Sequence, residues 1–189
     1  MKVEKKVVAG FLLCVGSVQC MLGIIVAEAL HPGYSTGQNY ISDLGVGPSS
    51  LIFNFSLIAI GVLGAVASYF IHHVFKRNSF TFLLMMGSIG AIGVGAFPEN
   101  VRVVHTAFSL VVFLFTGLAA VWSYSVEEPP FAYLYAGLGG IALLALALFG
   151  TEIYLGLGRG GMERLIAYPE LLWALSFGSR LSTHPLKPK

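Results

Sequence analysis

Charged residues are scarce in this chain: Asp, Glu, Lys and Arg together make up 11% of its 189 residues. A soluble domain carries about 25% charged residues, because charge is needed to cover a surface that faces water. Hydrophobic residues make up 56% of the chain, and its mean hydropathy is +0.81. This composition excludes a soluble globular domain and predicts an integral membrane protein. The net charge of +2 forms no basic stripe, so we expect no nucleic-acid partner.

Cysteine is also scarce, and the two cysteines, Cys14 and Cys20, both fall within the first apolar run. Residues six positions apart on a helix point in different directions. We therefore expect no disulfide and interpret both cysteines as small core residues. The run continues to about Leu30 without a clear cleavage site of small residues, which favours a helix of the mature protein over a signal peptide.

Long apolar runs are abundant, and several approach the ~20 residues that span a bilayer. Polar or proline-containing breaks divide them into six expected helices, at about 7–30, 51–75, 79–96, 98–124, 131–150 and 162–180. Pro32 disfavours helical geometry at His31, which ends the first helix. Pro98 suits the first position of the fourth helix. We therefore predict an all-α integral membrane protein with a single six-transmembrane-helix domain over residues 1–189.

The orientation in the membrane follows from lysine and arginine, which favour cytoplasmic loops. With a cytoplasmic N-terminus, eight of the eleven Lys and Arg residues lie inside, and only Arg102, Arg159 and Arg164 lie outside. This bias predicts a multi-pass protein of the cell membrane with both termini in the cytoplasm. The connection between the first two helices is then extracytoplasmic.

That connection, residues 31–50, is the one long polar interruption of the chain. It contains His31 and Asp43, and it also carries apolar side chains such as Ile41 and Leu44 that can be buried. Long connections within a compact protein are usually functional or disordered. We expect this one to be ordered.

Further ionisable residues are expected on the same side of the membrane. Glu99, Arg102 and His105 follow each other at intervals of three and share a broad helical face. In the last helix, one face carries Glu163, Ala167, Glu170 and Ala174, and the neighbouring face carries Arg164, Tyr168 and Leu171. Ionisable groups at membrane depth are costly and mark candidate functional sites.

We expect His31, Asp43 and His105 to line one pocket between the first, fourth and sixth helices, roofed by the 31–50 loop. The candidate catalytic residues are His31, Asp43, Glu99 and His105, and the candidate substrate-binding residues are Ser42, Arg102, Glu163, Arg164 and Tyr168. Other interpretations stay open: Glu163 and Arg164 could be interfacial residues at a helix end, and Arg102 could pair with Glu99 only to stabilise a turn.

Several motifs carry a family resemblance. They are Ile-Ser-Asp-Leu-Gly at 41–45, Phe-Pro-Glu at 97–99, His105, and Gly-Met-Glu-Arg-Leu-Ile-Ala-Tyr-Pro at 161–169. With them the chain resembles, over nearly its whole length, a prokaryotic membrane family catalogued as domain of unknown function 998. More weakly, it resembles a eukaryotic six-helix group of autophagy modulators and glycolipid-anchor remodelling proteins. The first resemblance implies a six-helix bundle, and the second implies a function directed at lipids.

The candidate residues suit more than one chemistry. A histidine oriented by an aspartate can act as a general base on water or on Ser42, while Arg102 or Arg164 holds an anionic headgroup. This predicts a protein that binds a membrane lipid and hydrolyses or remodels its headgroup. The alternatives are a lipid or solute binding or transport protein, a haem protein with His31 and His105 as axial ligands, or a purely structural ion-pair network.

His31 and His105 with Asp43 and a glutamate could also bind a divalent metal, but the signal is weak because no histidine pair has the compact His-x-x-x-His spacing, and we assign no metal ligands. The identity of any cofactor, and the question whether the protein is an enzyme, stay open at this point. A transporter with only six helices would need a homo-oligomer, so self-association also stays open.

Overall fold

The computed structural model describes residues 4–183, and within this range the secondary structure is entirely helical. Six long helices follow one another: α1 (Lys5–Leu30), α2 (Ser50–Phe75), α3 (Asn78–Ala96), α4 (Arg102–Trp122), α5 (Phe131–Gly150) and α6 (Gly158–Thr183). Short 3-10 turns are η1 (Ser42–Gly45), η2 (Gly47–Ser49) and η3 (Ser123–Ser125). The predicted all-α class is confirmed.

Five of the helices, α1 to α5, are long and apolar enough to cross a membrane. The chain is therefore a membrane protein, as its low charge predicts. The sixth helix, α6, differs because it carries Glu163, Arg164, Glu170 and Arg180. These four side chains are nevertheless buried or half-buried among neighbouring helices, while Arg159 at the start of α6 is exposed.

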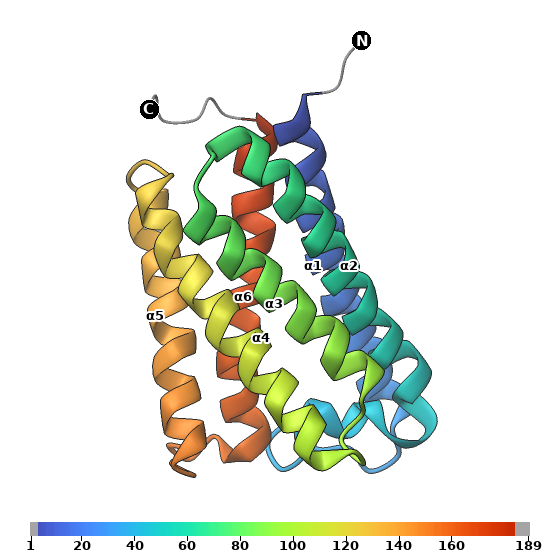
Figure 1. Ribbon diagram of the computed structural model, residues 1–189. Coiled ribbons are helices and arrows are strands. Elements are labelled where there is room, and N and C mark those ends of the chain that lie inside the picture. The colour runs from blue at the N-terminus through green and yellow to red at the C-terminus, as the bar shows by residue number, and fades with distance from the viewer. Residues whose placement is uncertain (1–3, 184–189) are drawn as a thin grey trace.

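The six helices form a closed ring (Figure 1). Each helix packs against the next one in the sequence, and α6 packs against α1 to close the ring. The hydroxyl of Ser182 in α6 donates a hydrogen bond to the carbonyl of Val7 in α1 at 3.3 Å, so these two helix ends lie together. We call this the terminal end. The opposite end, the loop end, carries the 31–49 connection, the α3–α4 turn and the α5–α6 connection.

Glycines allow neighbouring helices to approach closely, which is the packing role expected for small residues in membrane helices. A Cβ atom on Gly90 of α3 would lie 2.5 Å from the backbone nitrogen of Val112 in α4. A Cβ atom on Gly178 of α6 would lie 2.6 Å from the carbonyl oxygen of Gly10 in α1. Both contacts are too short for any side chain, so the backbones meet directly.

Two helix starts differ by four residues from the sequence-based expectation, while the other boundaries agree within three residues. The fourth helix begins at Arg102 rather than at 98, because residues 98–101 form a turn in which the Val101 N–H donates to the Pro98 carbonyl at 2.8 Å. Proline suits a turn as well as a first helical position, so Pro98 alone could not distinguish the two.

The sixth helix begins at Gly158 rather than at 162, and the added turn contacts the 31–49 loop. The Gly160 N–H donates to the Gly37 carbonyl at 3.1 Å. A Cβ atom on Gly160 would lie only 1.9 Å from the Asn39 carbonyl oxygen. Glycine-rich sequence usually indicates a loop, but here it lets α6 start directly against the connection.

Candidate functional site

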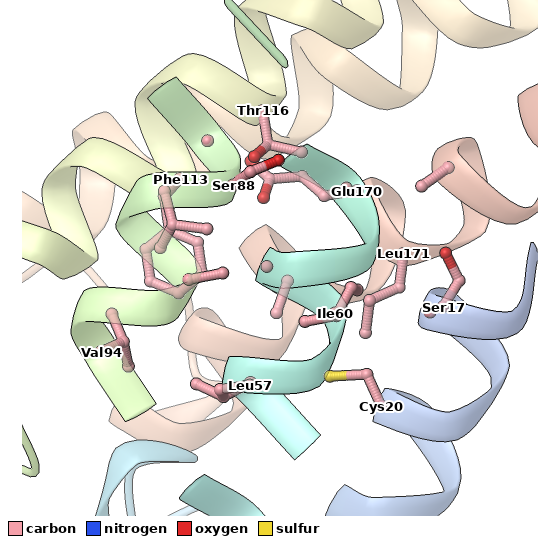
Figure 2. Close-up of a pocket in the computed structure, with 18 of the residues that line it drawn as sticks. Ser17, Cys20, Leu57, Ile60, Ser88, Val94, Phe113, Thr116, Glu170 and Leu171 are labelled. Carbon is pink, nitrogen blue, oxygen red and sulfur yellow. The ribbon is translucent and has the colours of Figure 1, made fainter. Parts of the chain in front are cut away.

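A cavity of about 140 Å³ lies inside the ring of helices (Figure 2). Its walls come from α1, α2, α3, α4 and α6, and residues Ile41 and Ser42 of the 31–49 loop line it as well. Most of the wall is apolar and includes Leu57, Phe113 and Leu171. Apolar cavities with a few polar groups are the usual form of a small-molecule site.

The hydroxyl groups in the wall are partly satisfied by their own helices. Ser17 donates to the Leu13 carbonyl at 2.9 Å, and Ser88 donates to the Leu84 carbonyl at 2.8 Å. Such bonds to the preceding turn remove the hydroxyl proton from use by a ligand. The carboxyl groups of Glu163 and Glu170 are therefore the principal polar features of the cavity.

Glu163 joins α6 to the loop. Its Oε2 atom accepts a hydrogen bond from the backbone N–H of Ile41 at 2.5 Å, and the residue is 7% exposed. The contact holds Ile41 and Ser42 against the cavity, so Glu163 marks the cavity's loop end.

Glu170 lies seven residues further along α6, two helical turns or about 10 Å deeper into the bundle. It is 5% exposed, and among the described residues its Oε1 atom has no hydrogen-bond partner. In Figure 2 it lies near Thr116 and Ser88 in the same part of the cavity. Glu170 was not among the candidate site residues, although it shares the predicted face with Glu163. All four members of that face, Glu163, Ala167, Glu170 and Ala174, line the cavity.

Asp43 and Glu99 form a pair of carboxyl groups at the loop end. Asp43 Oδ2 accepts hydrogen bonds from the Tyr40 N–H at 2.9 Å and from Asn39 Nδ2 at 3.1 Å. Ser42 Oγ donates to Glu99 Oε2 at 3.3 Å. Burial, and next to it the neighbouring Asp43 carboxyl, raise the pKa of Glu99 to about 7. The pair therefore retains a proton up to near-neutral pH.

Arg164 fastens the loop to the helices. Its Nη2 atom forms an ion pair with Glu28 of α1 and donates to the Tyr34 hydroxyl at 2.7 Å, while Nη1 donates to the Thr36 carbonyl at 2.9 Å. The Tyr34 hydroxyl in turn donates to the Tyr40 carbonyl at 2.8 Å, and burial raises the pKa of Tyr34 to about 12. Both terminal nitrogens of Arg164 are thus engaged by the protein itself. Glu28 was not among the candidate site residues, and its contact with Arg164 joins positions 136 residues apart, which no local pattern shows.

The two candidate histidines have separate partners. His105 is 5% exposed, and its Nδ1–H donates to the Phe97 carbonyl at 2.8 Å. His31 Nδ1 lies 3.0 Å from Ser49 Oγ. Because the Ser49 hydroxyl donates its hydrogen bond to the Leu44 carbonyl, Ser49 Oγ is the acceptor toward His31 and Nδ1–H is again the donor. None of His31, Asp43 and His105 lines the central cavity.

The remaining candidates lie around these groups. Arg102 is exposed at the start of α4. Tyr168 is half-buried and packs against a cluster that includes Phe53 and Leu171. Within residues 4–183, no three His, Cys, Asp or Glu side chains are grouped so that they could hold a metal ion.

Comparison with known proteins gives one finding. A model of the family described as Protein of unknown function (DUF998) matches residues 14–180, which include part of every long helix. Neither the curated proteins nor the solved structures include a match, so the weaker eukaryotic resemblance gains no support. Because the family model covers most of the chain, as the motifs at 41–45 and 161–169 predict, the protein belongs to the DUF998 family.

Proposed function

We propose that this protein is a six-span protein of the cell membrane that binds a membrane lipid at the loop end. The lipid headgroup would lie beside Ser42 and Glu163, and the adjoining carbons would enter the central cavity. The observation that carries this proposal is the cavity itself, which has apolar walls and a polar loop end. Its volume is similar to that of a cavity that holds benzene, about 150 Å³, so it fits a short apolar segment rather than a whole chain.

The proposed orientation places the loop end outside the cell and both termini in the cytoplasm. The distribution of eight Lys and Arg residues against three supports it. Three of the eight, Lys2, Lys187 and Lys189, lie outside the described residues.

A sixth span is supported by the length of α6 and by how its charges are paired. Its 26 residues extend about 39 Å, which exceeds the ~30 Å hydrocarbon core. Two of its three arginines, Arg164 and Arg180, pair with Glu28 and Glu127 near opposite ends of the helix, and the third, Arg159, is exposed at the start of the helix.

The charge at the loop end favours a particular headgroup. Arg164, which we expected to hold an anionic headgroup, is engaged by Glu28 and Tyr34, while Arg102 is exposed. The polar groups left to meet a headgroup are acidic. Glu163 lines the cavity, and Glu99 accepts a hydrogen bond from the Ser42 hydroxyl. A headgroup with a primary amine, such as that of phosphatidylethanolamine, complements these carboxyl groups because it donates charge-assisted hydrogen bonds.

Hydrolysis of the bound lipid is a second candidate function, favoured by the hydrogen bond from Ser42 to Glu99. In this step Ser42 Oγ bonds to the ester carbonyl carbon as its proton passes to Glu99. The alcohol then leaves with that proton, and water releases the acyl group from Ser42. A carboxyl group whose pKa lies near 7 is suited to both transfers at neutral pH.

Lipid retention tests the proposal. The full chain, purified and exchanged into phosphatidylcholine nanodiscs that contain minor amounts of phosphatidylethanolamine and phosphatidylglycerol, should retain the ethanolamine lipid when released for native mass spectrometry. Glu163→Gln keeps an acceptor for the Ile41 N–H but removes the charge. It should lower retention about 10-fold or more, the scale of one charge-assisted hydrogen bond.

Glu152→Gln is the matched control, because Glu152 is an exposed carboxylate at the same end of the bundle. It should leave retention unchanged. Equal retention of both lipids, unaffected by Glu163→Gln, would overturn the proposal. Release of fatty acid that is lost in Ser42→Ala while lipid stays bound would establish hydrolysis, and its absence in the wild type would leave binding alone.

A further inference from the structure

Glu170 is a buried acidic group for which neither the fold nor the proposed lipid site gives a use. Its Oε1 atom has no hydrogen-bond partner among residues 4–183, and the residue lines the central cavity. On α4, Oε1 lies 3.3 Å from the place that a Cβ atom on Gly117 would take. Among its polar neighbours in Figure 2, Ser88 already donates its proton to the Leu84 carbonyl.

No cation compensates this carboxyl group. Within the described part of the chain, the cavity wall contains no Lys, Arg or His. Its titratable side chains besides Glu170 are Cys20 of α1 and Glu163 of α6, while α2, α3 and α4 contribute apolar groups and hydroxyls. An unpaired carboxylate is strongly disfavoured in such surroundings, so the group loses its charge by taking up a proton.

A path for that proton leads to the loop end. Glu163 lies on the same face of α6, about 10 Å away along the axis, and lines the same cavity. One water needs roughly 10–15 Å³ of such space and about two to four polar partners. A cavity of about 140 Å³ has room for several waters, and the carboxyl and hydroxyl oxygens of its wall can accept their hydrogen bonds. Beyond Glu163, Ser42 contacts both the cavity and Glu99, which pairs with Asp43.

We propose that Glu170 is an exchangeable proton-binding site in the interior of the bundle, supplied from the loop end through Glu163 and water in the cavity. A protonated Glu163 passes its proton along the waters to the Glu170 carboxylate, and Glu163 regains one from the Asp43–Glu99 pair. Each round moves one proton inward, and the reverse order returns it. An apolar occupant of the cavity would expel the water and halt the exchange, which would couple the state of Glu170 to lipid binding.

Dicyclohexylcarbodiimide tests the presence of this proton, because it is lipid-soluble and reacts with protonated carboxyl groups. The acid proton moves to a carbodiimide nitrogen, the carboxyl oxygen bonds to the central carbon, and rearrangement leaves a stable acylurea. With the full chain in phosphatidylcholine vesicles, we expect an adduct on Glu170, identified in the wild type by tandem mass spectrometry. Its rate should fall about 10-fold per pH unit above the titration midpoint.

Infrared spectroscopy tests the path, because the carbonyl band of a protonated carboxyl shifts when deuterium replaces the proton. The Glu170 band, assigned by its loss in Glu170→Gln, should shift on mixing with D₂O. The shift should be at least about 10-fold slower in Glu163→Gln, whose neutral amide cannot relay a proton, the scale of a lost acid–base group. Glu152→Gln should exchange like the wild type.

Each outcome has a defined meaning. Absence of an adduct on Glu170 at any pH would overturn the proton site. An adduct whose rate ignores pH, or a band that D₂O does not shift, would identify a permanently protonated structural group and also overturn it. Unchanged exchange in Glu163→Gln would overturn the path from the loop end. Should Glu170→Gln fail to fold, the wild-type adduct and its pH dependence still decide the first question.

Discussion

The most informative single residues are the carboxyl groups, because their partners differ so much. Glu28 has an arginine, Glu163 has a backbone N–H, Glu99 has a serine and a second carboxyl group, and Glu170 has an unpartnered oxygen. The same functional group thus serves as a structural tether in α1 and as a candidate for chemistry in the turn before α4. Environment, rather than residue type, separates these roles.

The Asp43–Glu99 pair gives a pH-dependent prediction at this scale. The pKa of Glu99 is raised from 4.5 to about 7, so the folded state binds more protons than the unfolded state between these values. The free energy of unfolding should therefore fall as the pH rises through this window. Asp43→Asn removes the neighbouring charge while keeping an acceptor for the Tyr40 N–H, and the pH dependence should shrink but persist, because burial is the larger cause.

Thermal unfolding in detergent at several pH values measures this dependence. Glu152→Gln changes an exposed carboxyl group at the same end of the bundle and should leave the slope as it is in the wild type. A wild-type protein that becomes more stable as the pH rises from about 5 to 7, as carboxylates held by ion pairs would make it, would contradict the assignment.

At the scale of helices, the sequence predicts the positions of the helices and the buried face of α6. It does not predict which residues from distant parts of the chain contact each other. Apolar length and polar breaks locate all six helices, because hydrophobic burial in a bilayer requires long uninterrupted runs. The period of α6 identifies the face that lines the cavity, but nothing in the sequence shows which groups that face meets. The contact of Glu163 with Ile41 joins residues 122 positions apart, and it exists only because α6 packs back against α1.

Two glycine substitutions should have opposite effects on helix packing. Gly90→Ala places a methyl group 2.5 Å from the Val112 nitrogen, so α3 and α4 must separate. We expect a loss of about 1–3 kcal/mol in the free energy of unfolding, typical of overpacking. In Gly140→Ala of α5 the new methyl group meets nothing within 4 Å, and the helix gains about 0.5–1 kcal/mol from the better helix former.

Urea or detergent-denaturation curves measure both changes. Equal effects at the two sites would show that the α3–α4 contact is not as close as described.

For the whole molecule, the closed ring explains how a helix as polar as α6 fits among apolar ones. Its partners α1, α4 and α5 cover it, so Glu163, Arg164 and Glu170 meet protein rather than lipid. The same arrangement lines the cavity with five helices and places the 31–49 loop, the α3–α4 turn and the start of α6 at one end. Lipid binding and proton supply are both proposed for this end, and both depend on which side of the membrane it faces.

Orientation is therefore the prediction that decides which leaflet supplies the lipid and which side of the membrane supplies the proton. In a background with Cys14→Ala and Cys20→Ala, Gln38→Cys introduces a thiol at an exposed position of the loop end, and Arg77→Cys introduces one in the exposed turn between α2 and α3. With the loop end outside, a membrane-impermeant maleimide added to intact cells should label Gln38→Cys and should label Arg77→Cys only after permeabilisation. The physical reason is that lysine and arginine near helix ends are retained on the cytoplasmic side.

The reverse pattern would place the loop end in the cytoplasm and the lipid headgroup in the inner leaflet. Labelling of both thiols in intact cells would mean that the six helices do not all cross the membrane.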